Sequence, residues 1–123
     1  MNIIDSSAWL EYFANSKRAE YFAKPIEDER NLIVPTITIY EVFKKILTEK
    51  SEHAALQIVA HMKAGRVIDL NMNLALVAGA LSKKIKLPMA DSIILATARE
   101  HDATIWTQDA DFKNIKGVKY FPK

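Results

Sequence analysis

The chain has 123 residues, which suits one folded domain over residues 1–123 and leaves little room for a second. Of these residues 50% are hydrophobic and 26% are charged, so we expect a globular protein with a substantial core. The chain has no cysteine and a net charge of +2, which excludes a disulfide scaffold and thiolate metal ligands but does not identify a partner.

The start of the chain does not have the pattern of a targeting segment. No basic region precedes the first apolar residues, and Asp5 and Glu11 follow closely, so we expect neither a signal peptide nor a transit peptide. No apolar run approaches the roughly 20 residues that a membrane-spanning helix needs. A cytoplasmic protein is the expectation.

Short apolar runs alternate with amphipathic stretches along the chain. In chain order we expect a strand at 2–4, helices at 5–16 and 19–29, a strand at 32–35, helices at 38–50 and 52–64, a strand at 66–70, helices at 73–86 and 88–100, and strands at 104–107 and 118–121. This alternation indicates an α/β layer fold, with a short, mostly parallel sheet of four or five strands flanked by helices.

Four acidic residues are expected at one edge of this sheet. Asp5 directly follows the first strand and Asp109 follows the fourth. Glu41 lies near the first turn of the helix after the second strand, and Asp91 lies in the first turn of the helix before the fourth. Ligands of open α/β sheets bind beyond the carboxyl ends of the strands, which is where these side chains and the nearby Asp111 would meet.

Carboxylates gathered in this way repel one another. Two unit charges about 4 Å apart cost roughly 1 kcal/mol in bulk water and about 4 kcal/mol at an effective dielectric constant near 20. A small domain has a total stability of only about 5–15 kcal/mol, so a divalent cation is the expected remedy. Ligands that are all oxygen favour Mg²⁺ or Mn²⁺, and such an ion supports phosphodiester hydrolysis.

The charge of the remaining residues admits two interpretations. Setting the five acidic residues aside leaves ten acidic against 17 basic residues. A basic body around an acidic pocket suits a protein that binds a polyanion, but it is equally typical of a solvated surface. The basic residues that could either contact the phosphates of such a polyanion or lie on a solvated surface are Lys44, Lys45, Lys50, Arg66, Lys83, Lys84 and Lys86.

Each acidic residue also has a purely structural explanation when it is taken alone. Asp5 could cap a helix, and Glu41 could complete a Thr-x-x-Glu capping box. Asp91 could favour a helix N-terminus, and Asp109 and Asp111 could be turn residues. It is the coincidence of all of them at one sheet edge that favours a functional site.

Three segments resemble the PIN-domain family, and in particular its VapC-type toxins. The segments are NIIDSSAWLEYF, IVPTITIYEVFKK and KLPMADSIILATAREHDATIWTQDADF. They occur in the order in which the family has them, and together they span nearly the whole chain. The resemblance implies a PIN-like three-layer fold and a Mg²⁺- or Mn²⁺-dependent endoribonuclease, the toxin of a VapBC-type toxin–antitoxin pair.

The resemblance also implies roles for individual residues. The metal-binding acids would be Asp5, Glu41, Asp91, Asp109 and Asp111, of which the first four would be catalytic. Of Asp109 and Asp111, we expect Asp109 to be the closer metal ligand. Ser6 and Thr107 would support the carboxylates or a water molecule. Ser92 departs from the family, which often has alanine there. Metal-activated water would then cut RNA, leaving a 5′-phosphate and a 3′-hydroxyl.

The implied partners are RNA, a cognate antitoxin whose C-terminal segment fills the active-site groove, and a second copy of the chain in a homodimer. The aromatic residues that could serve these surfaces or the core are Tyr12, Phe13, Tyr21 and Phe22. Trp9 and Trp106 are expected to be buried against the sheet rather than to stack on bases.

Other functional classes need different residues. A metal-free ribonuclease could use His53 and His61, but a surface position is the better interpretation of both. A phospho-signalling receiver domain could use Asp69 and Lys119, but it needs paired acids where this chain has Asp5 followed by two serines. A PIN-like module that binds RNA without cutting it is a third alternative.

Overall fold

The structure, a computed structural model, describes residues 1–123. Its strands are β1 (Asn2–Ile4), β2 (Leu32–Pro35), β3 (Arg66–Ile68), β4 (Thr104–Thr107) and β5 (Val118–Tyr120). Its α-helices are α1 (Ser6–Phe13), α2 (Glu20–Glu27), α3 (Thr36–Glu49), α4 (Glu52–Met62), α5 (Met72–Ile85) and α6 (Met89–Glu100). Three short 3₁₀ helices complete the set, namely η1 (Lys17–Ala19), η2 (Glu29–Asn31) and η3 (Ala110–Phe112).

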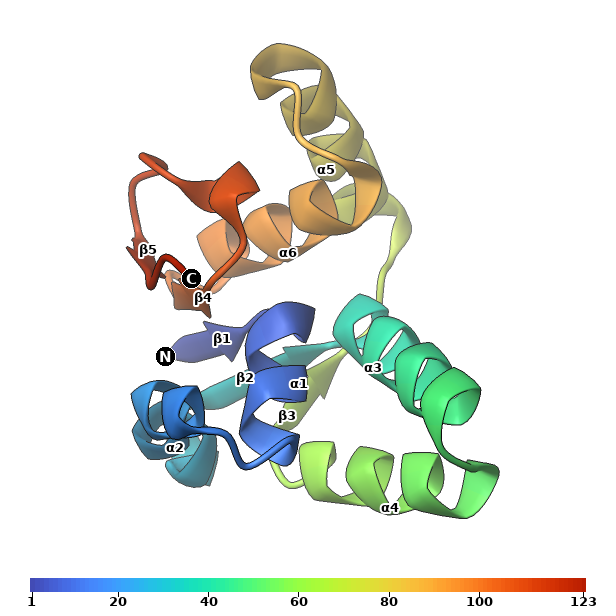
Figure 1. Ribbon diagram of the computed structural model, residues 1–123. Helices are drawn as coiled ribbons and strands as arrows, with labels where there is room; N and C mark the ends of the chain where they lie inside the picture. Colours follow the sequence, from blue (N-terminus) through green and yellow to red (C-terminus); the bar gives the residue numbers. More distant parts are fainter.

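The strands form one parallel sheet in the order β3-β2-β1-β4-β5 (Figure 1). Alternate residues of β1 point to opposite faces, as the two-residue period of a strand requires. Ile4 joins the core under α1–α4, and Ile3 joins a second core under α6. The predicted three-layer α/β fold is therefore confirmed, and β1 lies at the centre of the sheet.

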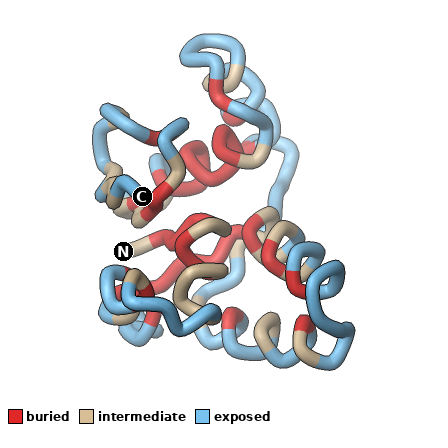
Figure 2. Tube along the Cα trace, viewed as in Figure 1, coloured by how far each residue is buried: buried red, intermediate tan, exposed pale blue.

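Helices α5 and α6 differ sharply in burial. All eight residues from Asp91 to Ala98 of α6 are buried, whereas α5 buries only Leu74 and Ala78 (Figure 2). α6 therefore lies between the sheet and α5, and most of α5 faces outward (Figure 1). None of the helices is both long enough and apolar enough to cross a membrane.

The expected element boundaries differ from the observed ones for local reasons. The first helix ends at Phe13 rather than at residue 16, and Asn15 takes a left-handed φ of 52°. The expected helix at 19–29 is a short α2 between two 3₁₀ helices. The strands expected at 66–70 and 118–121 end at Ile68 and Tyr120.

The helix that carries Glu41 begins two residues earlier than predicted. Pro35 is its N-cap, because a fixed φ, here −63°, suits a helix start. Thr38 therefore lies inside the helix, and its hydroxyl donates to the Pro35 carbonyl over 2.7 Å. The capping-box explanation of Glu41 is wrong, and Glu41 lies in the second turn of α3.

The strand order also excludes the receiver-domain alternative. In the receiver-like order 2-1-3-4-5 the third strand lies next to the first. Here β2 separates β3 from β1, so Asp69, which follows β3, lies at the outer edge of the sheet. An Asp69 phosphate acceptor beside Asp5 is therefore incompatible with this topology.

The aromatic side chains mostly serve the core. Trp9 and Phe22 are fully buried, Tyr12 and Phe13 are half-buried, and Tyr21 is exposed. Trp106 is half-buried, with its indole N–H donating to Asn2 over 2.9 Å. His53 and His61 are exposed on α4, and the His61 ring packs edge-on against Phe13.

Candidate metal centre

Asp5 lies where β1 ends and α1 begins. Its backbone N–H donates to the Trp106 carbonyl over 3.1 Å, which extends the pairing of β1 with β4 beyond the strand. Its side chain caps α1 by accepting from the Ala8 N–H over 3.1 Å. The capping explanation and the functional one are thus compatible, because one carboxylate has several lone pairs to offer.

The Asp5 carboxyl is nearly sealed from solvent, with an exposure of 2%. Besides Ala8, it accepts from the Ser7 hydroxyl over 2.8 Å and from the Thr107 hydroxyl over 2.7 Å. Burial raises the pKa of Asp5 to about 6, although the three hydrogen bonds act in the opposite direction. A fixed, desolvated carboxylate in this position is a good ligand for a cation.

Asp91, Asp109 and Asp111 form a cluster beside the carboxyl end of β4. Each offers an oxygen, and these oxygens all lie within 4.8 Å of one another. Asp91 is buried in the first turn of α6, Asp109 is half-buried just after β4, and Asp111 is exposed in η3. The helix before β4 and the loop after it therefore converge, as the sequence predicted.

The pKa of Asp91 reflects both its burial and the nearby carboxylates. Burial, followed by the charges of Asp109, Asp5 and Asp111, raises the pKa of Asp91 to about 8. Asp5 itself is raised in part by Asp109, so the buried carboxyl and the cluster act on each other. The four aspartates form one electrostatic unit.

Thr107 joins the two halves of this unit. Its hydroxyl donates to Asp5 and accepts from the Asp109 N–H over 2.9 Å. Asp109 in turn accepts from the Asp111 N–H over 2.9 Å, which caps η3. Thr107 thus sets the positions of two carboxylates at once, as its predicted supporting role requires, although the role itself stays a prediction.

Glu41 is placed beside this unit by a single contact. One of its carboxylate oxygens accepts from the Ser6 hydroxyl, the residue that follows Asp5. This hydrogen bond is compatible with the supporting role expected of Ser6, which stays a prediction. Glu41 does not belong to the cluster of Asp91, Asp109 and Asp111. The geometry does not rank Asp109 above Asp111, because both are members of that cluster.

Gln108 and Arg18, which the sequence analysis did not single out, brace the site. Gln108 is buried, and its amide donates to the Ser7 carbonyl over 3.4 Å and accepts from the Arg18 guanidinium over 2.9 Å. The only signal was a polar residue between Thr107 and Asp109. Ser92, the departure from the family pattern, donates to the Met89 carbonyl over 2.7 Å within its own helix.

The carboxylates have no cationic partner within the protein. The three ion pairs of the chain join Arg18 to Glu11, Lys45 to Glu49 and His101 to Glu100. None of these pairs includes Asp5, Glu41 or a member of the aspartate cluster. Unpaired carboxylates this close together, with the pKa values of Asp5 and Asp91 raised, fit a divalent cation, and a set of oxygen donors fits Mg²⁺ or Mn²⁺ better than zinc.

The fold and this site define a small parallel α/β protein with a carboxylate centre at the carboxyl ends of its central strands. Residues 3–118 match the family model of the PIN domain, and the chain belongs to the PIN-domain family. No curated protein matches the sequence.

Solved structures have the same fold. A toxin–antitoxin complex from Klebsiella pneumoniae is 22% identical, with a TM-score of 0.83 and 100% of both chains covered. VapC20 from Mycobacterium tuberculosis, a toxin that cleaves the sarcin–ricin loop, is 15% identical, with a TM-score of 0.81 and 99% of this chain and 100% of that one covered. DNA-bound VapBC from Salmonella typhimurium is 15% identical, with a TM-score of 0.73 and coverage of 98% and 96%.

Proposed function

We propose that this protein is a Mg²⁺- or Mn²⁺-dependent endoribonuclease, the toxin of a VapBC-type pair, which acts on RNA in the cytoplasm. The observation that carries the proposal is the convergence of unpaired carboxylates at the carboxyl edge of a PIN-domain sheet. VapC20, which shares this fold and cleaves the sarcin–ricin loop, supports an RNA substrate.

The acids that would hold the ion are Asp5, Glu41, Asp91, Asp109 and Asp111. A bound ion supplies a Lewis acid that lowers the pKa of a water molecule and neutralises charge on the phosphodiester. The protein's own contribution is rigidity. Three hydrogen bonds fix the Asp5 carboxylate, and Thr107 links Asp5 to Asp109. The metal-ligating oxygens are therefore in place before RNA binds.

The test uses purified protein, free of any antitoxin, with labelled single-stranded RNA and Mg²⁺ or Mn²⁺. We expect cutting that EDTA stops and that Asp5→Asn, which keeps a capping side chain, also loses. Glu52→Ala is the matched control, because Glu52 is an exposed acid on α4 outside the site. Circular dichroism would verify that each variant folds.

Two outcomes would contradict this proposal. Cutting that survives both EDTA and Asp5→Asn would exclude the carboxylate centre and return attention to the histidines of α4. RNA binding without cutting across a broad panel would favour the non-cleaving PIN-like module instead.

We also propose an antitoxin partner, as in the solved toxin–antitoxin complexes. A cavity of about 350 Å³ is lined by Ser7 and Gln108, by apolar side chains of α1, α3 and α4, and by Lys45 and Lys50. An antitoxin segment seated there would reach the carboxylate centre. Growth arrest on expression, relieved when the protein encoded next to this one is co-expressed, is the expected result.

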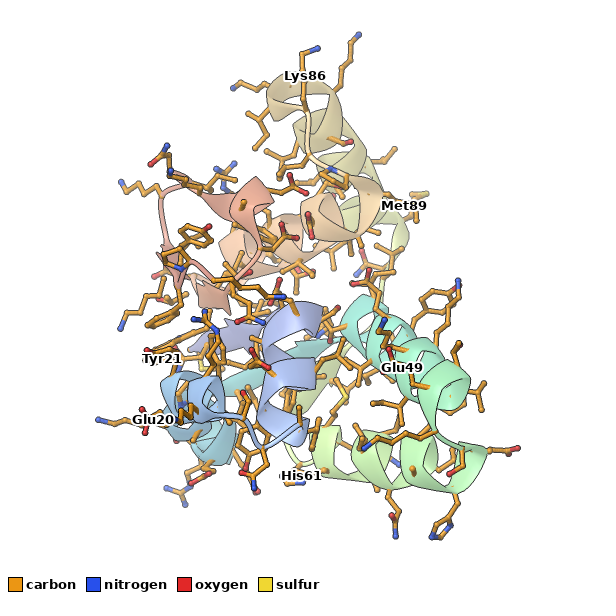
Figure 3. All side chains as sticks on the ribbon, in the orientation of Figure 1. Glu20, Tyr21, Glu49, His61, Lys86 and Met89 are labelled. Carbon is orange, nitrogen blue, oxygen red and sulfur yellow. The ribbon has the colours of Figure 1, made fainter.

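A homodimer is the remaining proposed assembly, and α5 supports it. Met72 and Leu76 are 80% and 66% exposed, and Met89 at the start of α6 is 71% exposed. Figure 3 labels Met89 at the start of α6 and Lys86 at the end of α5. Light scattering should give a dimer that Leu76→Glu converts to monomer, whereas Ala60→Glu, a control on α4, should not. A monomeric parent protein would contradict this assembly.

A further inference from the structure

Helix α3 presents a second face that the proposed chemistry does not use. Its buried residues Thr38, Val42 and Ile46 recur every four positions and hold the helix in the core. Tyr40 and Lys44 are offset from them by two residues, or about 200° around the helix. This places Tyr40 and Lys44 on the opposite side of α3, and both are exposed.

Tyr40 is the unusual member of this face. Its side chain is 60% exposed, so it contributes little to the core, and no other aromatic ring stacks on it. Its neighbour is the Lys44 ammonium, which lies 5.9 Å from the ring centroid. Lys44 forms none of the chain's ion pairs, whereas the adjacent Lys45 is 2.8 Å from Glu49. An open aromatic ring and a free cation therefore stand side by side.

This face is continuous with the carboxylate centre. A shallow cavity of about 260 Å³ is lined by Tyr40, Glu41, Lys44, Lys45 and Thr48. Glu41 lines this cavity and also accepts a hydrogen bond from Ser6, the residue that follows Asp5. A linear polymer bound at Glu41 would thus also lie over Tyr40 and Lys44.

We propose that the α3 shelf (Tyr40, Lys44 and Lys45) binds one unpaired nucleotide of the RNA substrate, next to the bond that is cut. The base stacks on the Tyr40 ring and the adjoining phosphate contacts Lys44. Any base can stack its flat face on an aromatic ring, and an ammonium group can pair with a phosphate. The shelf therefore has both groups that a binding site for single-stranded RNA needs. The inference rests on the proposed ribonuclease function.

The shelf also restricts which RNA is cut. A base inside a duplex is stacked between its neighbours and cannot cover a side chain, whereas loops and single strands can present one. Cutting at the carboxylate centre should therefore be selective for a nucleotide in a loop, a bulge or a single strand. A free cation, Lys44, beside an exposed ring favours a polyanion over an apolar protein surface.

The first test separates binding from chemistry. Tyr40→Ala should raise KM for single-stranded RNA roughly tenfold with little change in kcat, because stacking is uniform binding. Tyr40→Phe should restore the parent KM, since it keeps the ring. The preference for single-stranded over duplex RNA of the same sequence should fall with Tyr40→Ala. Fold stability should not fall, because alanine is the better helix former at an exposed position.

A second test needs no cutting. RNA binding is measured by fluorescence anisotropy at several salt concentrations in an Asp91→Asn background, which keeps the shape of the site. Lys44→Ala should reduce the slope of log Kd against log salt by about 0.7, the value for one phosphate contact on a single strand. Tyr40→Ala should weaken binding without changing that slope. Lys24→Ala, at an exposed position on α2, is the control and should change neither.

Three outcomes would overturn the shelf. The first is an active parent protein whose KM is the same in Tyr40→Ala. The second is an unchanged salt slope in Lys44→Ala. The third is a change of oligomeric state in Tyr40→Ala, which would make Tyr40 part of an interface between copies. Failure of the parent protein to cut RNA would instead count against the ribonuclease function, and the anisotropy experiment would still test the shelf.

Discussion

The carboxyl ends of β1 and β4 gather like charges without a counterion, whereas an aromatic stack nearby places two cations, Arg18 and Lys119, against its rings. In this aromatic stack Arg18 lies 5.4 Å from the Tyr21 ring and Lys119 lies 4.3 Å from the Trp106 ring. Between them, Phe121 stacks on Tyr21 at 5.2 Å and on Trp106 at 6.0 Å. Tyr21 is labelled in Figure 3, where α2 approaches the C-terminal segment.

The two regions differ in what their residues do for the fold. In the aromatic stack each contact is attractive, so removing one should cost stability. In the carboxylate centre the raised pKa values of Asp5 and Asp91 show that their charged forms are disfavoured. Removing a charge there should relieve the fold while it destroys the proposed function. An unfavourable local electrostatic energy is thus the mark of a functional site rather than of a structural one.

The largest expected effect is that of Asp91→Asn. Loss of a supporting residue costs a metal site about 10- to 100-fold, so loss of a ligand should lower RNA cleavage roughly a hundredfold or more. The same change should raise the melting temperature of the metal-free protein at pH 8, because an uncharged amide replaces a crowded carboxylate. Thermal unfolding in EDTA measures this. A lower melting temperature would contradict the contrast between the two regions.

Thr107→Val is the next test, since it removes the link between Asp5 and Asp109 without changing the shape of the side chain. Both hydrogen bonds of the hydroxyl are lost, and the Asp109 N–H loses its partner. We expect cleavage to fall about 10- to 100-fold and stability to fall by about 1–2 kcal/mol. Thr104→Val, at the other end of β4, is the control. Unchanged cleavage would show that Thr107 is only structural.

Much of the carboxylate centre is predictable because strand ends are marked in the sequence. The apolar runs before Asp5 and Asp109 fix where β1 and β4 end, and parallel strands bring those ends together. Asp91 follows the same logic through Pro88, the N-cap of α6. Glu41 was assigned one turn too early because Thr38 resembles a cap, whereas Pro35 actually begins the helix.

The bracing contacts could not be predicted in the same way. Arg18 and Gln108 are 90 residues apart, and their hydrogen bond depends on two long side chains whose orientations only the folded chain determines. The outward face of α5 could not be predicted from the sequence for a different reason. Leu74 and Leu76 are equally apolar in sequence, yet one is 1% exposed and the other 66%. Periodicity cannot separate them when both sides of a helix are apolar.

Phe121→Ala tests the opposite half of the comparison. The ring contacts Tyr21, Trp106 and the buried Phe22, so its removal should cost about 2 kcal/mol, less than a fully buried phenylalanine because the side chain is half-buried. Urea unfolding should show the loss, and Phe121→Leu should recover part of it. Cleavage should persist under folding conditions. Loss of cleavage in a folded Phe121→Ala protein would show that the two regions are not independent.

The pH dependence of the metal-free protein sharpens the contrast. An unfolded aspartate has a pKa near 3.8, whereas the folded values are about 6 for Asp5 and about 8 for Asp91. Between these limits the folded state binds more protons, so stability should fall as the pH rises from about 4 to about 8. Urea unfolding in EDTA at pH 5 and pH 8 measures the difference. Asp91→Asn should reduce this difference, and equal stabilities in the parent protein would contradict the raised pKa values of the two buried aspartates.

Lys119→Met should have the smallest effect, because it removes only the cation at the end of the aromatic stack. The methionine keeps most of the contact with Trp106 but loses the attraction between charge and ring, which is about 0.5–1 kcal/mol at an exposed site. Lys116→Met, which loses an exposed lysine not paired with a ring, controls for the change in net charge. If the two variants unfold at the same urea concentration, the cation contributes nothing, and the stability of this region comes from its stacked rings alone.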